Sequence, residues 1–176
     1  MFVRIISNTK KWTRLGNDSK SKNLPADCFN DLKTTQNTLS LWKIDSTDSA
    51  DICEQLVAVG AAGRSKIDKI VFVELSEQEL EEKKLTLQQD NPQCDYLNPD
   101  KSDFINRHYD IIEIDHNDLF NVAEIIMNKI ESKAVRILTK KQVKQILLGM
   151  KSQSIIINKG LQKDISSELF SQDKEL

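Results

Sequence analysis

The spacing of apolar and polar residues predicts a chain in which strands and helices alternate. Short apolar or alternating runs predict strands at 2–7, 38–44, 69–75, 85–89, 108–114, 134–138 and 154–158. Apolar residues at helical spacing predict helices after Asp48, Ser76, Asp115 and Thr139, together with a short helical turn at 24–32. This alternation favours an α/β fold, a single layered domain with a mixed, mostly parallel sheet flanked by helices. We expect the domain to span residues 1–163 and residues 164–176 to form a frayed C-terminal tail.

Local start signals support three of these helices. Two capping boxes are present in the sequence, SEQE at 76–79 and TKKQ at 139–142. Asp115 is placed to be an N-cap, with His116 at the first helical position and Asp118 at the third. At SEQE these local rules agree on a strand-to-helix junction between residues 75 and 76.

The chain of 176 residues has a net charge of −2, which gives no general attraction to nucleic acid or to membranes. No apolar run approaches the roughly 18 residues of a transmembrane helix, and the first residues lack the apolar core of a signal peptide. Cys28, Cys53 and Cys94 are scattered, without the spacing of a zinc site, which is typical of reduced thiols. We expect a cytoplasmic protein that has no contact with a membrane.

Charge is segregated along the chain. Residues 74–118 contain thirteen acidic and four basic side chains, and the poorly periodic stretch 90–107 within them predicts a long acidic loop. Residues 133–163 contain eight basic side chains and no acidic one. The candidate nucleic-acid or partner-binding residues are Lys133, Arg136, Lys140, Lys141, Lys144 and Lys151. The opposing segments could instead neutralise one another within the fold or across a homo-oligomer.

Common catalytic and cofactor motifs are missing from the sequence. It contains no GxxxxGK[ST], no GxGxxG and no GxSxG, so we expect no nucleotide cofactor and no familiar acyl-transfer site.

The stretch RHYDIIEIDH, residues 107–116, holds both histidines of the chain. On a strand, His108, Asp110, Ile112 and Ile114 would share one face, and a histidine beside a carboxylate is suited to acid–base catalysis or to metal binding. Spacing supplies no third ligand, so no metal is expected, and an ordinary strand entering a capped helix explains the same residues. His108 and Asp110 are the candidate catalytic pair.

Three functions are compatible with these observations. The first is a small non-catalytic accessory or regulatory protein that binds a protein partner, favoured by the segregated charge and the missing motifs. The second is nucleic-acid binding through the basic segment 133–163. The third is an enzyme, a nuclease or a transferase, that uses His108 and Asp110.

Overall fold

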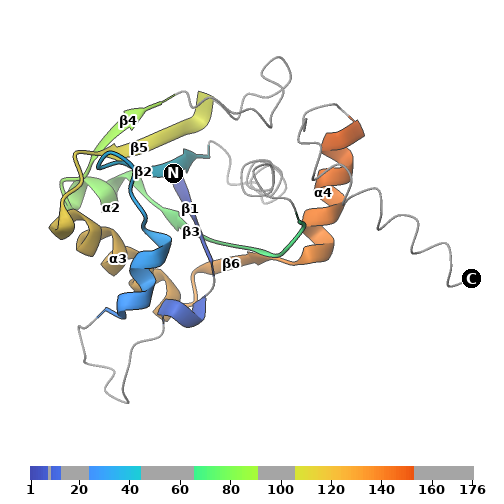
Figure 1. Ribbon diagram of the computed structural model, residues 1–176, viewed down its shortest axis with the longest axis horizontal. Coiled ribbons are helices and arrows are strands. Elements are labelled where there is room, and N and C mark those ends of the chain that lie inside the picture. Colours follow the sequence, from blue (N-terminus) through green and yellow to red (C-terminus); the bar gives the residue numbers. More distant parts are fainter. Residues whose placement is uncertain (8, 13–23, 45–65, 91–105, 153–176) are drawn as a thin grey trace, which may run out of the picture. The chain divides into compact units, whose positions relative to one another are not determined.

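The computed structural model describes residues 1–7, 9–12, 24–44, 66–90 and 106–152 (Figure 1). The strands are β1 (Phe2–Ile6), β2 (Leu39–Lys43), β3 (Ile70–Leu75), β4 (Thr86–Gln89), β5 (His108–Ile112) and β6 (Val135–Leu138). The helices are α2 (Glu77–Glu82), α3 (His116–Glu131) and α4 (Lys140–Ser152), with 3₁₀ turns η1 (Thr9–Trp12) and η2 (Ala26–Asp31). The α/β alternation predicted from the sequence is confirmed. The predicted helix after Asp48, the strand 154–158 and the tail 164–176 lie outside the described residues.

The six strands form one sheet in the order β4-β5-β2-β1-β3-β6, and every neighbouring pair is antiparallel. The prediction of a mostly parallel sheet is therefore wrong. Helices α2 and α3 do join strands that run in the same direction, β3 to β4 and β5 to β6. In the sheet, β5, β2 and β1 lie between β4 and β3, and β2, β1 and β3 lie between β5 and β6. Neither pair of strands with the same direction is therefore adjacent. A strand–helix–strand pattern fixes relative direction, but it does not fix which strands become neighbours.

The chain divides into two compact units. The first unit consists of residues 1–43, 71–90 and 108–136, and the second of residues 44–70, 91–107 and 137–176. The expected single domain over residues 1–163 stays a prediction.

The predicted helix starts are confirmed in detail. Ser76 and Glu79 form a reciprocal capping box at α2, and Thr139 and Gln142 do the same at α4. At α3 the carboxylate of Asp115 accepts hydrogen bonds from the backbone N–H groups of residues 117 and 118. The sequence signals succeed here because a cap involves only neighbours along the chain.

The largest cluster of buried apolar side chains lies on one face of the sheet. The side chains of this face pack with Trp12 of η1, Cys28 of η2, Leu80 of α2 and Val122 of α3. The side chains of β5 alternate, so that Ile111 belongs to this core whereas His108 and Asp110 point to the opposite face. Packing of Ile111 in the core thereby holds β5 in place, with its polar side chains on the opposite face.

Two helices end with a lysine in a left-handed conformation. Lys84 has a φ of 57° and Lys133 a φ of 59°. In both cases the following N–H reaches back to the helix, from Leu85 to Leu80 and from Ala134 to Lys129, which completes a Schellman motif. Glycine is the residue that adopts this conformation without a Cβ clash.

We expect Lys84→Gly and Lys133→Gly each to raise the free energy of unfolding relative to the alanine variant at the same position. The difference should be about 1 kcal/mol, because Ala removes the charge as Gly does but keeps the Cβ. Urea denaturation of the four variants measures it. A glycine variant no more stable than its alanine counterpart would contradict the strain ascribed to these positions.

Candidate functional site

Three adjacent strands bring polar side chains together on the face opposite the core. β5 lies between β2 and β4, and its Asp110 is paired with Ser40 on one side and with Gln88 on the other. Two residues before Asp110 on the same strand, His108 is paired with Trp42. The ring of Trp42 meets the imidazole edge-on at a centroid distance of 4.8 Å. Directly paired residues of neighbouring strands point to the same face, so the sheet register itself assembles this cluster.

Asp90 completes the cluster from the end of β4. Its backbone N–H donates to the carbonyl of His108 at 3.1 Å, which continues the β4–β5 pairing by one residue. Its Oδ2 lies 3.7 Å from Nδ1 of His108, and Oδ1 of Asp110 lies 3.8 Å from Nε2 of the same ring. One ligand-type atom from each of the three residues lies within 4.8 Å of the other two.

The imidazole is buried whereas one of its carboxylate neighbours reaches solvent. The side chain of His108 is 7% exposed, that of Asp110 13% and that of Asp90 54%. Nδ1 of His108 and Oδ1 of Asp110 are buried without a hydrogen-bond partner. Buried polar atoms are nearly always hydrogen-bonded in proteins, so two orphaned atoms on adjacent side chains call for an explanation such as a bound water, ion or ligand.

The burial of this histidine favours its neutral form. Burial lowers the pKa of His108 below the ordinary value, although the carboxylates of Asp110 and Asp90 and the backbone of Asp90 act in the opposite direction. Arg4 of β1 adds a smaller contribution that also lowers the pKa of His108. A neutral imidazole offers a lone pair, which both a general base and a metal ligand require.

Arg4 is itself a buried charge. Its guanidinium donates to the carbonyls of Ser40 and Asp31, each at 2.6 Å, and burial lowers its pKa. The side chain interacts electrostatically with Asp110. Arg4 therefore ties β1 to β2 and places a fixed positive charge near the Asp110 carboxylate.

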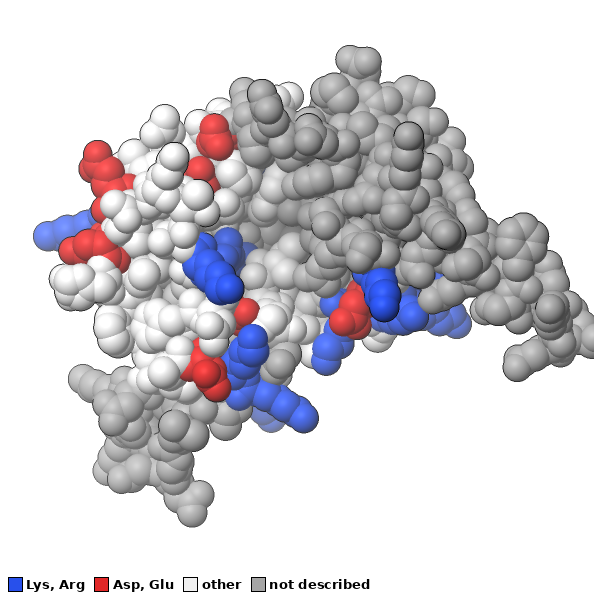
Figure 2. Space-filling model, viewed as in Figure 1, with Lys and Arg blue, Asp and Glu red and all other residues white. Residues whose placement is uncertain are grey.

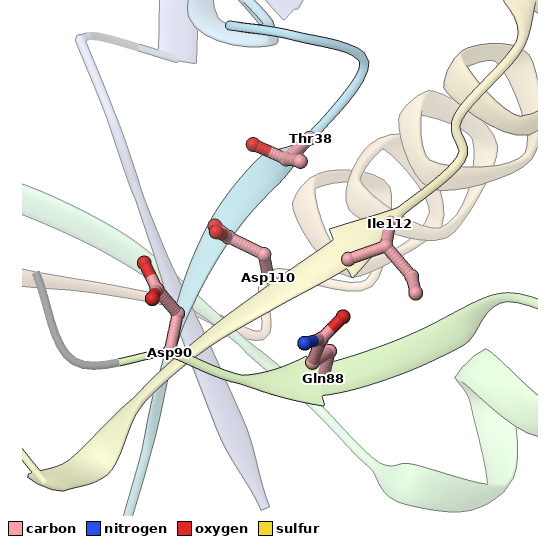
Figure 3. A pocket seen from close by; sticks show the side chains of 5 residues that line it. All are labelled: Thr38, Gln88, Asp90, Asp110 and Ile112. Atoms are coloured by element: carbon pink, nitrogen blue, oxygen red, sulfur yellow. The ribbon is translucent and has the colours of Figure 1, made fainter.

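A pocket of about 190 Å³ opens beside the cluster. Thr38, Gln88, Asp90, Asp110 and Ile112 line it. Figure 3 shows these side chains on one side of the three strands, with the carboxylates of Asp90 and Asp110 both turned toward the open space. The pocket is large enough for a few waters or a small polar group, and two carboxylates make it attractive to cations.

The candidate pair from the sequence is thus brought together, and the predicted common face of His108, Asp110 and Ile112 is confirmed. The predicted place of Ile114 on that face is wrong. The strand ends at Ile112, and Glu113 has a φ of 56°, so Ile114 turns into the core.

Sequence reasoning missed Asp90. This residue lies in the stretch 90–107, which was expected to be a loop. The available signal was the strand predicted at 85–89. If that strand pairs antiparallel with the next one, its first following residue comes opposite the start of β5.

The candidate basic residues do not form one described site. Lys133 and Arg136 belong to the first compact unit, and Lys140, Lys141 and Lys144 to the second. The guanidinium of Arg136 pairs with Glu74 at 2.8 Å, and in Figure 2 basic side chains of the described part lie beside acidic ones. The side chain of Lys151 lies outside the described residues.

One of the three scattered cysteines lies in the described part of the chain. Cys28 is a buried free thiol, and burial raises its pKa to about 11, which makes it unreactive. Cys53 and Cys94 lie outside the described residues. Among the described helices none is both long and apolar enough to cross a membrane.

Comparison with known proteins gives no assignment. No family model, no curated protein sequence and no solved structure matches this chain. The site geometry is therefore the basis of the functional argument.

Proposed function

We propose that the protein is a hydrolytic enzyme whose reaction takes place in the pocket beside His108 and Asp110. The observation that carries the proposal is the buried imidazole of His108, whose Nδ1 is orphaned. Asp90 lies 3.7 Å from Nδ1 and Asp110 lies 3.8 Å from Nε2, and both carboxylates line the pocket. A buried histidine with a displaced pKa and a carboxylate partner in a concave site is the usual arrangement for activating water.

The reaction that fits this site is the cleavage of a small ester or amide. A water oxygen attacks the carbonyl carbon, and the imidazole–carboxylate centre takes up the proton that the water loses. The bond from carbon to the leaving oxygen or nitrogen breaks, and the leaving atom receives that proton. The products are a carboxylic acid and an alcohol or amine, and no oxidation or reduction occurs.

Charge narrows the substrate class. Asp90 and Asp110 both line the pocket, and none of the lining residues that the structure describes is basic. When no cation is bound, a highly charged anion such as a phosphomonoester would approach two carboxylates and be repelled. We therefore propose uncharged or cationic substrates. The charge of the pocket favours ester or amide cleavage over the nuclease reaction, which was one alternative from the sequence.

The test compares hydrolysis of p-nitrophenyl acetate with that of p-nitrophenyl phosphate by the purified full chain. We expect turnover of the acetate above the rate in buffer, and a fall in kcat/KM of about 100-fold or more in His108→Ala and Asp110→Asn. His116→Ala is the matched control, because His116 is the other histidine and lies exposed at the start of α3. Equal activity of His108→Ala and His116→Ala would contradict the proposal.

The alternative to this proposal is a non-catalytic protein that binds another macromolecule. The segregation of acidic and basic residues along the chain supports this alternative. We place the protein in the cytoplasm under either function, in keeping with the free thiol of Cys28. An affinity pull-down with and without nuclease tests the alternative. A stoichiometric protein partner that survives nuclease, together with no hydrolytic activity, would favour it.

A further inference from the structure

We propose that Asp90, His108 and Asp110 bind a divalent transition-metal ion at the edge of the pocket. This inference rests on the proposed function and deepens it, because the ion would be the group that activates the attacking water. It assigns the neutral imidazole the role of a ligand and brings in Asp90.

The three ligand atoms come from positions that the sheet fixes. His108 and Asp110 lie two residues apart on β5, and the backbone hydrogen bond from Asp90 to His108 holds the end of β4 opposite them. Their ligand atoms lie within 4.8 Å of one another. Bonds of about 2.0–2.2 Å to a common ion require them to approach somewhat closer. Asp90 is half exposed at a strand end, so its side chain can rotate inward to close the site.

The burial of His108 is the second, independent observation. Acidic side chains often gather on a surface without binding anything, but this cluster contains an imidazole whose side chain is 93% buried, the complement of its 7% exposure. Its Nδ1 has no hydrogen-bond partner and faces Oδ2 of Asp90 at 3.7 Å. Oδ1 of Asp110 is orphaned as well. An ion bound between the imidazole and these carboxylates would give a partner to a buried polar atom that the fold leaves without one.

The chemistry of the donors selects the class of metal. One imidazole nitrogen with two carboxylate oxygens suits Mn²⁺, Fe²⁺, Co²⁺, Ni²⁺ and Zn²⁺. Ca²⁺ and Mg²⁺ favour sites built from oxygen alone. Two carboxylates balance the charge of the ion, and the pocket beside Thr38 and Gln88 leaves room for a bound water or substrate oxygen.

The experiment titrates the full chain with Co²⁺ alone and records visible absorption, followed by calorimetry with Zn²⁺ and Mg²⁺. We expect one Co²⁺ per chain with d–d bands, displacement by Zn²⁺, and no displacement by millimolar Mg²⁺. Asp90→Asn should weaken Co²⁺ binding by at least about 100-fold, since even the partners of metal ligands contribute 10- to 100-fold. Asp27→Asn, an exposed aspartate of η2, should leave binding unchanged.

Asp90→Asn is the decisive variant, because a half-exposed residue at a strand end can be changed without unfolding the protein. His108→Ala is examined alongside it, with circular dichroism to verify folding. Absence of Co²⁺ and Zn²⁺ binding would overturn the inference, as would binding that Asp90→Asn and a folded His108→Ala leave intact.

The two proposals fail in different ways. Metal binding lost in Asp90→Asn, without hydrolysis of p-nitrophenyl acetate, would uphold the metal site and overturn the hydrolase. Hydrolysis that depends on His108 but persists with EDTA would uphold the hydrolase and overturn the metal site, with the imidazole then acting as a general base.

Discussion

Replacement of Trp12 by alanine is expected to lower the free energy of unfolding by about 3–5 kcal/mol, the range typical of a large buried aromatic side chain. Trp12 is fully buried in the core cluster, although it belongs to a single turn of 3₁₀ helix just after β1. Its indole N–H donates to Oδ2 of Asp31 at 2.9 Å, and the carbonyl of Asp31 accepts from Arg4. The indole therefore holds η2 against the start of the sheet through both packing and a hydrogen bond.

Two variants separate these contributions. Trp12→Phe keeps most of the apolar volume but leaves Asp31 without its indole donor, so a loss of about 1–2 kcal/mol is expected. Phe120→Ala is the matched aromatic control, because Phe120 is 52% exposed on α3 and should contribute about 1 kcal/mol or less. Chemical denaturation measures all three variants. Equal losses for Trp12→Ala and Phe120→Ala would contradict the assigned burial.

The elements of this fold could be predicted from the sequence because they depend on short-range rules. The capping boxes at Ser76 and Thr139 need only side chains three residues apart, and the alternation of β5 needs only a period of two. Glu113 has a left-handed backbone conformation, which ends the alternation of side chains along β5. Glutamate is not a residue type that predicts such a conformation. A non-glycine residue with positive φ is rare enough that a pattern argument passes over it.

The order and direction of the strands depend on long-range choices that local patterns do not contain. The sequence predicts a helix between β5 and β6 but gives no sign that β2, β1 and β3 lie between them in the sheet. The same dependence on long-range pairing explains why only part of the candidate site could be predicted from the sequence. His108 and Asp110 are near neighbours along the chain, whereas Asp90 reaches them only through the antiparallel pairing of β4 with β5.

The site is also the place where the fold departs from ordinary rules of polar burial. Among the described residues, buried side-chain atoms without hydrogen-bond partners occur on Arg4, His108 and Asp110. All three belong to one electrostatic group, since Asp110 and Arg4 both act on the pKa of His108. Such a group lowers the stability of the folded chain unless a bound ligand satisfies it.

A stabilising variant at His108 is the prediction that follows. In the presence of EDTA, His108→Phe should raise the free energy of unfolding by about 1–3 kcal/mol, the usual penalty of an unsatisfied buried polar atom. Phenylalanine retains a ring that can meet Trp42 edge-on, as the imidazole does, and it has no orphaned nitrogen. His116→Phe, at an exposed helix start, should change stability by less than about 0.5 kcal/mol.

Addition of metal should reverse the order of stability. An ion that binds only the folded state stabilises it by about 4.1 kcal/mol when its concentration is about 1,000 times its Kd, and the wild type gains this stability whereas His108→Phe does not. Urea denaturation with EDTA and with Zn²⁺ measures both halves of the prediction. A residue that serves only to bind a ligand does not stabilise the fold, so its replacement should not destabilise the protein in EDTA. If His108→Phe is less stable than the wild type in EDTA by more than about 1 kcal/mol, the imidazole contributes to packing rather than to a ligand site.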